Sequence, residues 1–137
     1  MFNERTAPSD VVLIILSLLG KGKTFPSDKK FLCKKFFELS KKFSELFQDF
    51  IFDGSEKCKE VDIVINRITR FEMAEQESPK DDFSILPALV SKGKVLMKLF
   101  SASERDQLSK AAGKFAEMIK SNYKEDKKCV CVVCKCG

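Results

Sequence analysis

The sequence predicts a single, mostly α-helical domain of about five helices with one small β-hairpin. Its length of 137 residues suits one domain, and a hydrophobic fraction of 44% is sufficient to form a core. Apolar residues between Leu32 and Phe50 are spaced 4, 3, 4, 3 and 4 apart, which is the pattern of one buried helix face. Turn-forming residues from Ser78 to Asp82 separate two short segments with strand character. We expect the domain to span residues 1–123 and a charged, cysteine-rich tail to occupy residues 124–137.

The first three helices follow from their caps and their apolar spacing. The first is predicted from about Ser9 to Leu19, is capped by Ser9 or Thr6, and is apolar on nearly all sides, so we expect it to be buried. A loop is predicted at residues 21–26. The second helix is predicted at residues 27–47. The third is predicted at residues 55–71, with a buried face formed by Cys58, Val61, Ile65 and Ile68.

The hairpin and two further helices complete the predicted domain. Strands are predicted at residues 72–77 and 83–86. Pro87 has no backbone N–H, so it limits the pairing of the second strand and favours a place at the sheet edge. A fourth helix is predicted after Ser91. Ser101 and Glu104 have the spacing of a capping box, which predicts a fifth helix over residues 102–122.

The segment from Ile85 to Leu96, with Ser91-Lys92-Gly93-Lys94 at its centre, resembles the segment that closes the wing in many winged helix-turn-helix regulators. The predicted order of helix, helix, helix, hairpin and helix is also that of this class. An apolar first helix before a lysine-rich second helix is similar to archaeal and prophage members. The resemblance covers roughly residues 9–120. It implies a transcriptional regulator that binds duplex DNA and has no enzymatic activity.

The positive charge is concentrated in one segment. The chain carries a net charge of +5, and eight lysines but only two acidic residues lie between Lys21 and Lys42. Such a segment is either a solvated helix face or a contact surface for phosphates. In the winged-helix interpretation, the second helix contacts the DNA backbone through Lys29, Lys30, Lys34, Lys41 and Lys42.

The third helix is the best candidate for reading base edges. Asn66, Arg67 and Arg70 lie opposite its apolar face, and these residue types bind bases or phosphates. The alternative is a solvated face on which the arginines pair with Glu60, Asp62 or Glu72. Lys80, at the tip of the hairpin, is expected to reach the DNA backbone or minor groove.

Several catalytic classes are excluded by composition. The chain has no histidine, which excludes a Ser-His-Asp triad, a Cys-His dyad and a His-ligated zinc. Gly22-Lys23-Thr24 has the end of a phosphate-binding loop, but Ser17 stands where that motif needs its first glycine. We therefore expect no enzyme.

The C-terminal tail carries four closely spaced thiols. They follow the pattern C-x-C-x2-C-x-C and comprise Cys129, Cys131, Cys134 and Cys136. Four thiolates satisfy tetrahedral zinc and also suit Cu(I). Two disulfides are favoured over such a metal site, and a strand-like extension or modified thiols are further alternatives. Cys33 and Cys58 fall on apolar helix faces and are expected to be buried.

The expected partners follow from the same patterns. Double-stranded DNA is the first, and a second copy of the chain, docked through residues 102–122 and the stripe Leu108, Ala112, Phe115 and Ile119, is the other. No membrane span is expected, because the apolar run from Val11 to Leu19 is too short, and we expect a cytoplasmic protein. The alternative function is a helical protein–protein interaction module without a nucleic-acid partner, in which the Phe-rich second helix and the fifth helix dock a partner protein.

Overall fold

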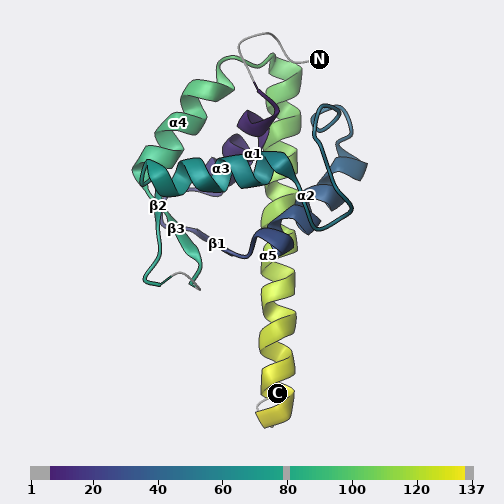
Figure 1. Ribbon diagram of the computed structural model, residues 1–137, viewed down its shortest axis with the longest axis vertical. Helices are drawn as coiled ribbons and strands as arrows, with labels where there is room; N and C mark the ends of the chain where they lie inside the picture. The colour runs from purple at the N-terminus through teal and green to yellow at the C-terminus, as the bar shows by residue number, and fades with distance from the viewer. Residues whose placement is uncertain (1–6, 79–80, 135–137) are drawn as a thin grey trace.

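The computed structural model describes residues 7–78 and 81–134, with side chains as far as residue 120, and is mostly helical, as predicted (Figure 1). Five helices and three short strands follow one another along the described chain. Their order is α1 (Pro8–Ser17), β1 (Thr24–Phe25), α2 (Lys29–Lys42), α3 (Lys59–Arg70), β2 (Ala74–Glu75), β3 (Phe83–Ile85), α4 (Pro87–Met97) and α5 (Ala102–Cys134).

Helix α1 is the centre of the core. It packs against α3, α4 and α5, and every residue from Ser9 to Ser17 is buried, which confirms the burial predicted from its apolar sequence. Its start differs from the prediction, because Pro8 opens the helix and Ala7 takes the N-cap position. Proline is favoured there since the first helical N–H has no partner within the helix. Ser9 therefore lies inside the helix, and Thr6 lies outside the described residues.

The hairpin is confirmed, and β1 extends it to three strands. The antiparallel order is β1-β3-β2, with Phe25 opposite Phe83 and Ala74 opposite Ile85. The prediction of a plain loop at residues 21–26 was therefore wrong, because β1 lies within it. The rings of Phe25 and Phe83 stack with their centroids 5.3 Å apart, so one face of the sheet closes onto the core.

The role predicted for Pro87 was also wrong. Strand β3 is central rather than at the edge, and it ends at Ile85. Pro87 follows as the first residue of α4, a position where its fixed φ favours a helix and its missing N–H costs nothing. For this reason α4 begins at Pro87 and not after Ser91.

Helix α2 is shorter than its apolar pattern. The helix ends at Lys42 rather than Phe47, and a turn-rich loop over residues 43–58 leads to α3. The apolar pattern continues through that loop, because Leu46 and Phe47 are buried and the Phe47 ring lies 6.2 Å from that of Phe36. Helix α3 correspondingly begins at Lys59, four residues after the predicted start.

Helix α5 begins as predicted and is longer than predicted. The Ser101 N–H donates to Glu104 Oε1 at 2.8 Å and the Glu104 N–H donates to Ser101 Oγ at 3.2 Å, which forms the expected capping box. The helix continues to Cys134 and projects beyond the other elements (Figure 1). The alternative of a strand-like extension at the first tail cysteines is therefore wrong.

Candidate nucleic-acid interface

The outward face of α3 is a regular row of side chains. Lys59, Ile63, Asn66 and Arg70 are exposed and are spaced 4, 3 and 4 residues apart, so they lie on one side of the helix. The opposite side is buried and consists of Val61, Val64, Ile65 and Ile68. We call the exposed row the α3 outer face. Two of its members, Asn66 and Arg70, were predicted from the sequence.

The other two members of the α3 outer face, Lys59 and Ile63, were not among the residues predicted to bind DNA. The signal that could have found them is the same 4, 3, 4 spacing, counted on the side opposite the apolar stripe. Asp62 is also exposed, beside this face and in the first turn of the helix, where the helix dipole favours a carboxylate.

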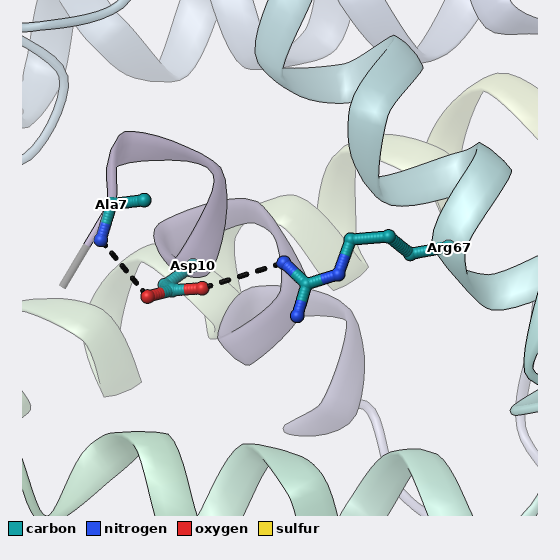
Figure 2. Close-up of polar contacts among 3 residues, drawn as sticks. All are labelled: Ala7, Asp10 and Arg67. Carbon is teal, nitrogen blue, oxygen red and sulfur yellow. Dashed lines mark hydrogen bonds and ion pairs between the residues drawn. The ribbon is translucent and has the colours of Figure 1, made fainter.

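Arg67 does not belong to the α3 outer face. Its guanidinium Nη1 lies 3.6 Å from Asp10 Oδ1, and Asp10 Oδ2 accepts a hydrogen bond from the Ala7 N–H at 2.9 Å (Figure 2). The Asp10 side chain is 9% exposed and that of Arg67 32%. The prediction that Arg67 points outward to read bases is thus corrected: it turns inward and links α3 to the start of α1. The alternative prediction, in which the arginines pair with acidic residues, is correct for Arg67. Its partner is Asp10 of α1, however, and not Glu60, Asp62 or Glu72.

The lysines predicted to contact phosphates are all exposed. Lys30, Lys34 and Lys41 are four and seven residues apart, so they share one face of α2, opposite its buried residues. Lys29 and Lys42 lie at the two ends of the helix. Asp28 caps the first turn, where its Oδ1 accepts from the Lys30 N–H at 2.9 Å. The structure therefore brings together a row of exposed lysines on α2, one of which, Lys41, places its Nζ 4.8 Å from the centre of the Phe37 ring.

One lysine of the basic segment faces the protein instead. Lys35 is 8% exposed, and its Nζ lies 3.6 Å from Glu38 Oε2 and 5.3 Å from the centre of the Phe31 ring. The Lys35 charge is therefore balanced by contacts within α2. The lysines that remain exposed lie on the side of α2 that faces away from the core.

Buried polar contacts hold the start of α3 against α2 and the intervening loop. The Glu60 side chain accepts hydrogen bonds at Oε1 from the Ile51 N–H at 3.0 Å and from Cys58 Sγ at 3.5 Å. The Cys33 thiol of α2 donates to the Cys58 carbonyl at 3.9 Å. These contacts orient α3 relative to α2 even though the loop between them is long.

Both of these cysteines are buried free thiols, as predicted for each, although Cys58 is the N-cap of α3 rather than a member of its apolar face. Burial raises the pKa of the Cys33 thiol to about 11 and that of the Cys58 thiol to about 12. Because only the thiolate is a good nucleophile and metal ligand, both groups serve packing at neutral pH.

The hairpin lies beside the end of α3 (Figure 1). The Met73 N–H donates to the Ile68 carbonyl at 3.0 Å, which closes the helix and starts the turn into β2. Glu72 adopts a left-handed φ of 51° in this turn, and for this reason the strand predicted from Glu72 is confined to Ala74–Glu75. Lys80, predicted to contact DNA at the tip, lies outside the described residues.

A groove of about 580 Å³ lies between the end of α1, β1 and α5. Its apolar lining includes Leu18, Leu19, Pro26, Ala112, Ala116 and Ile119, with Lys23 and Lys120 also in the lining. The stripe predicted to dock a second copy is largely occupied within the monomer: Leu108 and Phe115 are fully buried, and the Phe115 ring lies 4.8 Å from that of Phe36. Part of the surface of α5 that faces solvent in this region lines the groove, through Ala116 and Ile119.

The described part of the chain shows neither a metal centre nor a membrane span. Among the described side chains, no three His, Cys, Asp or Glu residues gather in a group that could hold a metal ion. The side chains of Cys129, Cys131, Cys134 and Cys136 lie outside that part of the chain. No helix in the described ranges combines the length and apolarity needed to cross a bilayer.

Comparison of the chain with models of known families, with curated proteins and with solved structures finds no significant match in any of the three.

Proposed function

We propose that this protein is a winged helix-turn-helix transcriptional regulator that binds duplex DNA, with the α3 outer face in the major groove and the α2 lysines on the phosphate backbone. The observation that carries the proposal is the combination of an exposed Lys-Ile-Asn-Arg row on α3 with an exposed lysine row on α2. In helix-turn-helix proteins the second helix of the motif enters the major groove while the first crosses the backbone.

The order of the elements supports the proposal. The described chain contains three helices, then a hairpin, then two further helices, and β1 pairs with the hairpin to complete a small sheet. The hairpin follows directly from the end of α3. It therefore lies beside the proposed recognition helix, which is where the wing lies in winged helix-turn-helix proteins. Residues 43–58 form a longer connection between α2 and α3 than a compact helix-turn-helix needs, and the Glu60 and Cys33 contacts hold it in place.

The alternative interaction module would need different surfaces from those first expected. The Phe-rich face of α2 and the apolar stripe of α5 pack on each other in the core, through Phe36 and Phe115. Most of both faces is therefore covered, and Ala112 and Ile119 of the α5 stripe also line the groove.

The proposal includes a homodimer through residues 102–122, since helix-turn-helix dimers engage two half-sites. Because Leu108 and Phe115 of the predicted stripe are used in the core, we assign the contact to the groove, which is lined by the other two members, Ala112 and Ile119, and by Ala116.

Charge reversal on α2 tests the DNA interface. We expect the triple variant Lys30→Glu, Lys34→Glu, Lys41→Glu to bind random duplex more weakly, and the slope of log affinity against log salt to flatten by about 0.9 for each phosphate that the protein no longer neutralises. The matched control reverses three exposed lysines, Lys92 and Lys94 on α4 and Lys98 at its C-cap, which changes the net charge equally. Fluorescence anisotropy over a salt series measures both. Equal decreases in affinity in the two triples would mean that α2 makes no specific contribution.

A further inference from the structure

An apolar side chain lies in the middle of the polar α3 outer face. Ile63 is 37% exposed, while the other aliphatic residues of α3 (Val61, Val64, Ile65 and Ile68) are buried. Lys59 precedes it by one turn and Asn66 follows it by one turn. Single exposed apolar residues are common on protein surfaces, so it is the position of Ile63 in this row that carries information.

The major groove presents one apolar group, the 5-methyl of thymine, and the bidentate partner of an Asn amide there is adenine, through N6 and N7. Side chains three residues apart on a helix have Cβ atoms about 5–6 Å apart. Ile63 and Asn66 are therefore close enough to contact the same base pair or neighbouring base pairs.

The ends of the α3 outer face carry charge. Lys59 and Arg70 are separated by about 16 Å along the helix axis, at 1.5 Å per residue, whereas the major groove is about 12 Å wide. With Ile63 and Asn66 over the bases at the centre, the two cations reach the phosphates or the outermost base pairs. The α3 outer face thus has the uncharged Ile63 and Asn66 at its centre, with the Asp62 carboxylate beside them, and a cation at each end.

Resting on the proposed function, we propose that the central contacts of α3 select A·T pairs: Ile63 packs on a thymine methyl group, and the Asn66 amide pairs with an adenine in the same or the adjacent base pair. Ile63 and Asn66 are then the specificity-determining residues, while Lys59, Arg70 and the α2 lysines supply affinity.

The test uses the full chain and a binding site selected from random duplex DNA. Each thymine of that site is replaced in turn by deoxyuridine, which removes only the 5-methyl group. We expect about a fourfold loss of affinity at one or two central positions, the effect of burying one methyl group. The Ile63→Ala variant should bind thymine and deoxyuridine sites equally, and the Asn66→Ala variant should lose its preference for adenine.

The matched control is Val95→Ala, which shortens an exposed aliphatic side chain on α4, 56% exposed. It should retain the full sensitivity to deoxyuridine. If the parent protein binds no duplex even at low salt, the proposed function fails. If it binds a selected site but no thymine methyl matters, or if Ile63→Ala retains the methyl preference, DNA binding stands and the assignment of Ile63 is overturned.

Discussion

The contact between Asp10 and Arg67 joins two helices that lie far apart in the sequence. The Asp10 carboxylate is almost fully buried, and its two oxygens face the Ala7 N–H and the Arg67 guanidinium (Figure 2). A buried carboxylate needs such partners, because the loss of hydration is otherwise uncompensated. Arg67 therefore contributes to the folded state by neutralising Asp10, and its place on α3 fixes how that helix turns against α1.

We expect Arg67→Ala to lower the free energy of unfolding by about 1–3 kcal/mol, because it leaves a nearly buried carboxylate without its ion-pair partner. Arg70→Ala, three residues further along the same helix and exposed, should change it by no more than about 0.5 kcal/mol. Urea denaturation of the two variants measures the difference. If Arg67→Ala matched the parent in stability and lost DNA binding, the side chain would belong to the interface after all.

At the scale of elements, the crossing of α1 and α4 is unusually close. Gly93 is buried in α4, and a Cβ at this position would overlap the side chain of Ser17 on α1. The Ser17 hydroxyl is itself fixed, since it donates to the Ile14 carbonyl at 2.7 Å. The glycine of the Ser-Lys-Gly-Lys segment is therefore required for helix packing in this chain.

Gly93→Ala should destabilise the fold by about 1–3 kcal/mol, the usual cost of overfilling a packed site. The matched control is Gly113→Ala on α5, where an added Cβ meets nothing within 4 Å. That change should stabilise the protein by up to about 1 kcal/mol, because alanine is the better helix former. Thermal and urea unfolding at the same protein concentration compare the two. Two variants with the same sign of effect would contradict the close crossing.

The sequence predicted which faces are buried better than it predicted where elements end. The 4, 3, 4, 3, 4 spacing from Leu32 to Phe50 identifies four buried residues and two, Phe43 and Phe50, that are partly buried against the core. Helix α2 nevertheless ends at Lys42, because apolar residues of a turn-rich loop can pack on the same core as a helix. Strand β1 has two residues, and its existence depends on the register with Phe83 and Ser84. Local sequence carries no such information.

The candidate site shows the same division. The exposure of the α2 lysines, Asn66 and Arg70 follows from periodicity alone. The inward turn of Arg67 depends on Asp10, which is brought beside it only by the packing of α1 on α3. A sequence pattern places residues on one face of a helix. The tertiary fold then decides which residues at the edge of that face form contacts inside the protein, as Arg67 does with Asp10.

For the whole molecule, the most distinctive feature is the length of α5, which projects beyond the other elements (Figure 1). Its first half packs on α1 and α2, and it then projects past the rest of the domain (Figure 1). A helix that stands alone in water is marginally stable, because most helical stability in proteins comes from packing of one face. The groove lies against α5 at residues 109–120, close to where the helix leaves the domain. A second copy seated in this groove would cover its apolar lining on α5, close to the point where the helix leaves the domain.

We therefore expect light scattering under reducing conditions, at high micromolar concentration, to give twice the 15.6 kDa mass of the chain. Ala116→Arg places a charge in the groove and should give a monomer, with the helical circular dichroism of the domain retained. Glu117→Arg changes the exposed neighbouring residue, which does not line the groove, and should remain a dimer. A monomeric parent, or a dimer that persists in Ala116→Arg, would exclude this groove as the contact. If the groove is the contact, the Ala116→Arg monomer should bind a single half-site with the affinity of one domain and lose the added affinity of a two-half-site duplex.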